Sequence, residues 1–351
     1  MADPAPRLPV TVVAGFAGAG KSTLVGHWLR THPAGERWAL LANASAIEPA
    51  DDTVLAPASH RAAAPRGGAP ARRTANGLYR VVGGCACCTA QASARSAIIE
   101  LLRAGPWDRL VIELDGAAHP GALVDLLRRP PLDALLRVDG IVTVVDAARP
   151  GPFESEPMHP LARAQVEVAS RVVLNRAGRL ADERRAALLR GLAEAPPFGR
   201  AVDATDDGLA PWRPGVGPHG AREGTGSTPG CSSAGSGQPP AAAIDWRCPA
   251  DAVFDRRRLQ ALLATWPARL PLSHGVGAFR TERDWYLWRH GDAGTSWEAC
   301  AYRLENRLQL VFKPSAQVPE IHATIDAALA GVRIAPTGDA THGGPGDDGV
   351  R

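Results

Sequence analysis

The stretch Gly15-Phe-Ala-Gly18-Ala19-Gly20-Lys21-Ser22-Thr23 lies between an apolar segment predicted as a strand and a segment predicted as a helix. It fits the pattern G-x-x-x-x-G-K-[ST], in which glycines let the backbone wrap closely around phosphate groups. Successive N–H groups and the positive end of the following helix favour an anion there. The stretch therefore predicts a nucleoside triphosphate site in which Lys21 reaches the β- and γ-phosphates and the Ser22 hydroxyl binds Mg²⁺.

The lysine content of the chain strengthens this interpretation. Of 39 basic residues only Lys21 and Lys313 are lysine, and the rest are arginine. A chance match to the pattern at this place is therefore improbable.

Outward from this loop, short apolar segments alternate with helical ones as far as about Val202. The apolar segments show little polar alternation, which is typical of strands buried on both faces of a parallel sheet. The predicted strands are Val10–Ala14, Trp38–Ala42, Leu78–Val82, Arg109–Leu114, Gly140–Val145 and Arg171–Leu174. The predicted helices are Ser22–Arg30, Ala90–Arg103, Pro120–Arg128 and Asp182–Glu194. This rhythm predicts an α/β fold with a mostly parallel, layered sheet and helices on both faces.

The composition divides the chain further. Residues 1–205 form the predicted α/β domain, within which 56–76 lacks periodicity and is predicted to be a mobile surface loop. A Gly-, Pro- and Ser-rich stretch, 206–240, is predicted to be a flexible linker, and 333–351 a disordered tail. Residues 241–332 are predicted to form a small α+β domain. Its predicted elements are the helices Asp255–Thr265 and Glu320–Leu329 and the strands Gly275–Arg280, Trp285–His290, Ala299–Leu304 and Leu308–Phe312.

The overall composition bounds the class of protein. Apolar residues make up 45% and charged residues 21%, as in ordinary globular chains, and the net charge is only +3. This balance favours neither nucleic acid nor a membrane as partner. We find no signal-peptide pattern in Met1–Pro9 and no apolar run near the roughly 20 residues that span a bilayer. Three of six cysteines are crowded together, unlike a disulfide framework, so we expect a reducing cytoplasm.

A second acidic motif ends the predicted strand Arg109–Leu114. Ligands bind outside the carboxyl ends of strands in open α/β sheets, so acidic residues there suit a metal or catalytic role. Either Glu113 or Asp115 is expected to hold Mg²⁺, directly or through water, and the Gly116 N–H to contact the γ-phosphate. Together with Lys21, these two carboxylates are the predicted catalytic residues.

The third motif is Gly84-Cys85-Ala86-Cys87-Cys88-Thr89. Thiolates suit soft or borderline metals such as Zn²⁺, and a helix start lowers thiol pKa values and so favours the thiolate. Cys85, Cys87 and Cys88 are therefore predicted to bind a transition metal. The isolated Cys231, Cys248 and Cys300 have no such spacing and are interpreted as structural.

These three motifs in this order resemble the CobW-type P-loop GTPases, metallochaperones related to the nickel-insertion GTPases of urease and hydrogenase maturation (the CobW/HypB/UreG nucleotide-binding domain). The resemblance rests on Gly15–Thr23, the G-C-x-C-C element at Gly84–Cys88, and E-x-x-G at Glu113–Gly116. It implies a P-loop NTPase fold, and GTP binding and hydrolysis that control zinc or cobalt at the cysteines. Asp146, ending the next strand, and a small carboxyl-terminal domain also fit.

The chain departs from that family's pattern in three places. The base-recognition element N-K-x-D is here Asn175-Arg176-Ala177-Gly178, so Asn175 and Arg176 are predicted nucleotide contacts but the guanine-reading carboxylate is lost. Such a loss is worth about 1–3 kcal/mol, which predicts a weak preference for GTP over ATP. The switch element N-E-x-G is here Asn43-Ala44-Ser45-Ala46, which predicts slow hydrolysis and leaves Asp51 downstream as a candidate Mg²⁺ ligand. In the second domain the family's Arg-x-Lys-Gly is here His274-Gly275-Val276-Gly277.

Three functional hypotheses follow. The first is an NTP-hydrolysing metallochaperone that uses GTP or ATP, Mg²⁺ and Zn²⁺ or Co²⁺, and delivers its metal to a metal-requiring client protein. The second is a nucleotide-gated metal-binding or sensing module with little hydrolysis and relaxed base specificity. The third, a P-loop kinase, assigns no role to the cysteines.

Overall fold

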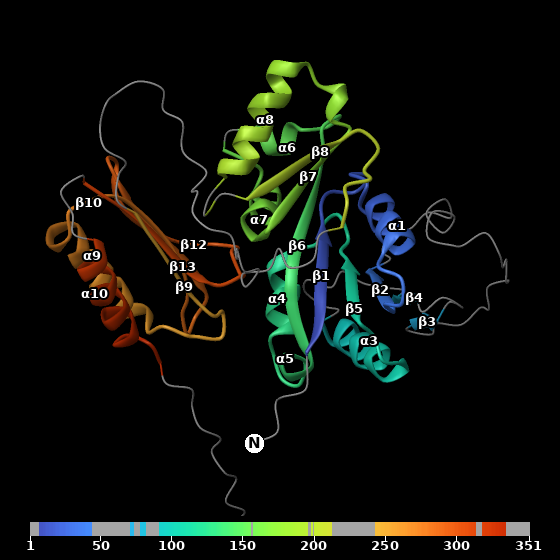
Figure 1. Ribbon diagram of the computed structural model, residues 1–351, viewed down its shortest axis with the longest axis horizontal. Coiled ribbons are helices and arrows are strands. Elements are labelled where there is room, and N and C mark those ends of the chain that lie inside the picture. The colour runs from blue at the N-terminus through green and yellow to red at the C-terminus, as the bar shows by residue number, and fades with distance from the viewer. Residues whose placement is uncertain are drawn as a thin grey trace, which may run out of the picture. The chain divides into compact units, whose positions relative to one another are not determined.

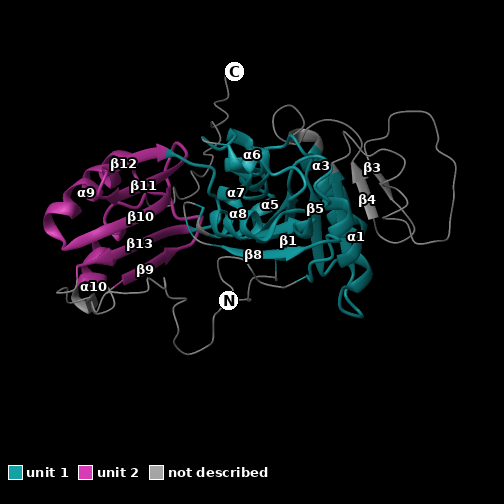
Figure 2. Cartoon of the chain, turned by 90° about the horizontal axis from the view of Figure 1, so that it is seen from above, with its two compact units in different colours: residues 1–237, 299–305 teal, residues 238–298, 306–351 magenta. Residues whose placement is uncertain are grey.

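The structure is a computed structural model that describes residues 7–43, 71–73, 78–81, 91–155, 157–195, 198, 200–212, 243–313 and 318–334. The chain divides into two compact units (Figure 2). The first comprises residues 1–237 and 299–305, and the second 238–298 and 306–351.

The first unit is built on one eight-stranded sheet in the order β3-β4-β2-β5-β1-β6-β7-β8 (Figure 1). All of its pairings are parallel except that of the edge strand β3 with β4. Its strands are β1 (Leu8–Ala14), β2 (Trp38–Asn43), β3 (Ala71–Arg73), β4 (Leu78–Val81), β5 (Arg109–Glu113), β6 (Leu136–Asp146), β7 (Arg171–Asn175) and β8 (Ala201–Thr205). Its helices are α1 (Lys21–Thr31), α3 (Gln91–Ala104), α4 (Pro120–Leu127), α5 (Leu132–Leu135), α6 (Gly151–Glu154), α7 (Pro160–Val168) and α8 (Asp182–Glu194), with the 3₁₀ turn η1 (Ala177–Arg179).

Both faces of this sheet are covered by helices. Successive side chains of a strand point to opposite faces, so neighbouring residues of β6 enter different clusters. Val144 belongs to a buried cluster with Leu24 and Trp28 of α1, whereas Val145 belongs to one with Val166 of α7. Burial on both faces explains why the central strands carry runs of apolar residues instead of an alternating pattern.

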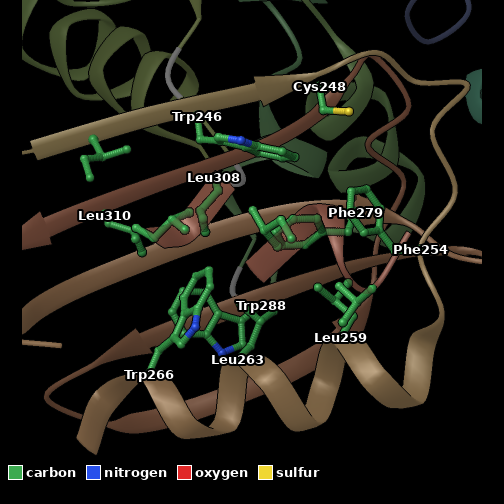
Figure 3. Close-up of a cluster of buried hydrophobic side chains, with 14 of the residues drawn as sticks. Trp246, Cys248, Phe254, Leu259, Leu263, Trp266, Phe279, Trp288, Leu308 and Leu310 are labelled. Atoms are coloured by element: carbon green, nitrogen blue, oxygen red, sulfur yellow. The ribbon is translucent and has the colours of Figure 1, made fainter. Parts of the chain in front are cut away.

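The second unit holds a five-stranded sheet in the order β12-β11-β10-β13-β9. Three of its pairings, β10 with β11, β10 with β13 and β13 with β9, are antiparallel. Large aromatic and leucine side chains, among them Trp246, Phe279 and Trp288, form its core between the sheet and the helix that carries Leu259 and Leu263 (Figure 3). Its elements are β9 (Ala243–Cys248), α9 (Arg256–Arg269), β10 (Leu272–Arg280), β11 (Trp285–Gly291), β12 (Gly294–Ala299), β13 (Asn306–Phe312) and α10 (Val318–Ala330).

The predicted strand Ala299–Leu304 is wrong. Only Ala299 belongs to a strand, as the last residue of β12, and residues 299–305 cluster with the first unit. There the N–H of Ala301 donates to Glu167 Oε2 of α7 at 2.9 Å, and Arg128, which follows α4, donates to the carbonyls of Arg303 and Leu304. The segment is apolar because it is buried against helices, and its backbone bonds to side chains instead of to a neighbouring strand.

The predicted fold class is confirmed: a mostly parallel layered sheet with helices on both faces, and a small α+β part built on its own antiparallel sheet. Sequence reasoning missed β9, although its residues alternate between exposed and buried. It also placed no strand within 56–76, where β3 lies. The other residues of that stretch, and most of the predicted linker and tail, lie outside the described residues.

Candidate functional site: a phosphate-binding loop at the carboxyl edge of the sheet

The loop from Gly15 to Gly20 connects the carboxyl end of β1 to the start of α1. Its three glycines all have positive φ, 139° at Gly15, 73° at Gly18 and 104° at Gly20, which side chains disfavour. A Cβ on Gly20 would also collide with the side-chain amide of Asn175. That amide donates a hydrogen bond of 2.9 Å to the loop carbonyl of Ala19. Close packing and left-handed backbone together require the glycines that the motif contains.

Lys21 begins α1 and is almost fully buried, with 7% of its surface exposed. Its ammonium group donates to the carbonyls of Gly15 at 2.9 Å and Phe16 at 3.1 Å. The positive charge is therefore held over the loop itself, beside the positive end of the helix. Such a place favours an anion strongly, because little water is present to screen it.

Ser22 and Glu113 are 91 residues apart in sequence but form a hydrogen bond of 2.6 Å, from Ser22 Oγ to Glu113 Oε1. They meet because β1 and β5 are parallel neighbours, with Val13 opposite Glu113, so both strands end at the same edge. Glu113 is only 7% exposed. A hydroxyl and a buried carboxylate in contact are the hard oxygen donors that Mg²⁺ prefers.

Asp115, the other predicted acidic candidate, has a different role in the structure. Its Oδ1 accepts from the N–H of Ala117 at 2.8 Å, and its carbonyl from the N–H of Ala118 at 3.0 Å, so it stabilises the turn after β5. Gly116, in the same turn, lies directly against the backbone of Ala17 in the phosphate-binding loop. The structure thus brings Glu113, not Asp115, to Ser22.

The predicted base-recognition element begins at the carboxyl end of β7 and contacts the phosphate-binding loop. Asn175 is 3% exposed, and its Nδ2 donates to the carbonyl of Ala19 at 2.9 Å. Arg176 adopts the left-handed conformation, with φ 58°, and its guanidinium donates to the carbonyl of Gly18 at 3.2 Å. Both predicted contact residues therefore position the loop itself.

Asp146 forms ion pairs with two arginines beside the phosphate-binding loop, although the sequence alone gave it no role beyond fitting the family's pattern. It lies at the carboxyl end of β6 and pairs with Arg176 at 2.7 Å and Arg149 at 3.0 Å. Burial alone would raise the pKa of Asp146, but the hydrogen bonds from Arg176, Arg149 and the N–H of Ala148 outweigh it and hold the pKa below its ordinary value. Arg149 was missed entirely, and only its nearness to a strand-ending acid could have suggested it.

The remaining predicted residues are placed as follows. Thr23 lies half-buried in the first turn of α1. Cys85, Cys87, Cys88 and Asp51 lie outside the described residues. Within the described ranges no group of three or more His, Cys, Asp or Glu residues is arranged to hold a metal ion. Of the cysteines interpreted as structural, Cys248 and Cys300 are buried, and Cys231 lies outside the described residues.

A parallel sheet, a glycine-rich loop wrapped before a helix, and the lysine and serine that begin that helix define a P-loop NTPase fold. The sequence profile of the family "CobW/HypB/UreG, nucleotide-binding domain" matches residues 9–197. Because this match covers more than half of the chain, the chain belongs to that family. The resemblance inferred from its motifs is confirmed.

Individual relatives agree with this assignment. The chain is 31% identical to the zinc chaperone CobW of Pseudomonas aeruginosa over 221 residues, 57% of each chain. It is 30% identical to the zinc chaperone YeiR of Escherichia coli over 179 residues, 51% of this chain and 49% of that one. The matched regions thus span about half the length of these curated relatives.

Among solved structures, the Zn(II)-bound YjiA GTPase from E. coli aligns with 94% of this chain and 100% of its own, at 21% identity and a TM-score of 0.47.

Over the part of the chain that the structure describes, no helix has both the length and the apolar character needed to cross a membrane.

Proposed function

We propose that this chain is a GTP-binding and GTP-hydrolysing metallochaperone that carries zinc or cobalt at Cys85, Cys87 and Cys88 and delivers it to a client protein. The observation that carries the nucleotide part is the Ser22–Glu113 hydrogen bond beside the buried ammonium of Lys21. Two independent strands there bring together a cation for the phosphates and oxygen donors for Mg²⁺.

The phosphate groups are bound by Lys21, by the amides of the loop from Gly15 to Gly20 and by the amino-terminal end of α1. Asn175 and Arg176 hold that loop in shape from the neighbouring strand β7. Because hydrogen bonds within the chain hold the loop, little ordering is needed on binding.

Ser22 and Glu113 are the residues that would hold Mg²⁺, which fits their buried pair of oxygen donors. When bound, the ion neutralises charge on the β- and γ-phosphates. The chain's own residues then act by position and charge: Lys21 stabilises the phosphate oxygens, and Gly116, packed on Ala17, keeps the turn after β5 against the phosphate-binding loop. Phosphoryl transfer to water depends largely on such positioning.

The metal is the cargo of this protein, and the cysteine motif is proposed to bind it. Three thiolates match the ligand preference of zinc and leave one position open, which suits a metal that must be passed on. β4 runs parallel to β2, so it ends at the same sheet edge as the phosphate-binding loop, and the motif begins shortly after Val81. The names of the relatives, zinc chaperones, support zinc. Reduced thiolates require a reducing compartment, so we propose the cytoplasm.

Phosphate release from GTP and from ATP, measured with and without Zn²⁺, tests this proposal. We expect Mg²⁺-dependent turnover that is lost in Lys21→Ala and that responds to Zn²⁺. Nucleotide and metal binding without turnover above background would instead support the nucleotide-gated sensing module. The residue that favours this second function is Ala44, which stands where the family pattern has Glu.

A further inference from the structure

Position 178 lacks a side chain, and another residue occupies the space beside it. The N–H of Gly178 donates a hydrogen bond to Oδ1 of Asp206, which is 28 residues away in sequence. A Cβ on Gly178 would lie 2.8 Å from Oδ1 and 3.1 Å from Oδ2 of that carboxylate. The glycine therefore makes room for the carboxylate of Asp206 at the position where an aspartate at 178 would begin.

Asp206 reaches this position because β7 and β8 are parallel neighbours. Asn175 at the end of β7 pairs with Thr205 at the end of β8, so the loops that follow the two strands lie side by side. Gly208, with φ 75°, packs onto Asn175: a Cβ there would lie 3.4 Å from Asn175 Nδ2. The loop after β8 thus rests on the residue that holds the phosphate-binding loop through Ala19.

The distances across the sheet place this carboxylate where a base would lie. In the strand order β1-β6-β7-β8, β7 and β8 are two and three strands from β1, about 10 and 14 Å at the usual strand spacing. A nucleotide with its phosphates in the loop after β1 can span that distance along the carboxyl edge. Its base then lies beside the loops after β7 and β8.

Two adjacent aspartates occur in this loop, and the structure distinguishes them. Asp207 Oδ1 accepts from the Thr205 hydroxyl at 2.7 Å and from the N–H of Leu209 at 2.9 Å, so its carboxylate stabilises the turn. These bonds also lower the pKa of Asp207. Asp206 is exposed to solvent, and its described contact is to the N–H of Gly178. A ligand can therefore reach the carboxylate of Asp206.

We propose that Asp206 is the residue that selects guanine, and that it replaces the carboxylate missing at position 178. Guanine presents two donors on one edge, N1–H and the 2-amino group, and a carboxylate can accept hydrogen bonds from both. Adenine has no N–H donor at either position. The inference rests on the proposed nucleotide-binding function and specifies its base. It also reverses the expectation, drawn from Gly178 alone, of a weak preference for GTP over ATP.

The test compares equilibrium affinities for GDP, ADP and xanthosine diphosphate, measured by calorimetry on the full-length protein. Asp206→Asn should lower GDP affinity about 10- to 100-fold, because an amide hydrogen replaces one acceptor oxygen. ADP affinity should stay within about threefold, which also reports an intact fold and phosphate-binding loop. Asp206→Asn should bind xanthosine diphosphate more tightly than the wild type does. Xanthine carries a carbonyl where guanine carries the amino group, and the new amide can donate to it. Asp207→Asn is the matched control and should keep the wild-type order of affinities.

A relocated carboxylate gives an independent measurement. Gly178→Asp added to Asp206→Gly should restore the preference for GDP over ADP, because removing the side chain at 206 frees the space beside position 178 for the new carboxylate. Equal wild-type affinities for GDP and ADP, or an unchanged preference in Asp206→Asn, would overturn the assignment of Asp206 and leave the proposed function standing. Failure of the wild type to bind any nucleotide would overturn both.

Discussion

Gly116→Ala tests whether the turn after β5 and the phosphate-binding loop form one packed unit. A Cβ at this position would lie 2.8 Å from Ala17 Cα and 3.0 Å from Ala17 Cβ, and closer still to the Ala17 nitrogen. Carbon atoms pack at about 3.5–4.0 Å, so the two segments must separate by roughly 1 Å. Two of the three colliding atoms belong to the backbone, so no side-chain rotation can relieve the contact.

The expected consequences follow from that displacement. Inserting a methyl group into packed backbone costs about 1–3 kcal/mol of the free energy of unfolding. A displacement of about 1 Å beside reacting groups lowers turnover up to about a hundredfold. We expect GDP affinity to fall much less, because the proposed site binds the diphosphate by the loop from Gly15 to Gly20 and not by the turn.

Urea unfolding, GDP calorimetry and GTP turnover measure these three effects. Gly191→Ala is the matched control: it lies on α8 with open space around it, and should stabilise the chain by about 0.5–1 kcal/mol. Wild-type stability together with wild-type turnover in Gly116→Ala would show that the two loops do not pack as described.

Three further predictions concern the metal, Mg²⁺ and pH. Cys87→Ala should weaken Zn²⁺ binding in a competition titration with a chromophoric chelator and leave nucleotide affinity unchanged; unaltered zinc affinity contradicts the metal site. Glu113→Gln should weaken Mg²⁺-dependent nucleotide binding about 10- to 100-fold, whereas Asp115→Asn should have a smaller effect; equal losses would refute the choice between the two acids. The pKa of Asp146 is lower in the folded than in the unfolded chain. Its carboxylate therefore stabilises the folded chain fully when the pH is above the unfolded-state pKa, and this stabilisation is lost as the pH falls through the folded-state pKa. Asp146→Asn should therefore be less stable at pH 7 and lose less stability between about pH 5 and about pH 3 in urea unfolding; parallel pH profiles would contradict this.

Much of the first unit was predictable because local signals there agree with the tertiary structure. The three middle residues of β5 and of β7 are all apolar, and both strands are buried along their whole length in the interior of the sheet, so the pattern and the burial match. The segment 299–305 was not predictable in this way. It is as apolar as a strand, but its burial comes from packing on α4 and α7, which no local pattern encodes.

In the candidate site, too, the residues of a local motif were predictable from the sequence, whereas contacts between strands were not. The sequence alone predicts roles for Lys21 and Ser22, because their chemistry depends on a contiguous loop before a helix. It left Glu113 and Asp115 as alternatives, since both follow the same strand. Only the hydrogen bond to Ser22 and the turn around Asp115 distinguish them.

By itself, the sequence determined the parallel α/β fold, the phosphate-binding loop and the family, because each depends on residues close together in the chain. The tertiary structure decided which carboxylate meets Ser22, how Asp146 pairs with Arg176, and what lies beside Gly178. These contacts join the ends of separate parallel strands, and strand order sets them. Thus Asp206 reaches Gly178 only because β8 lies next to β7.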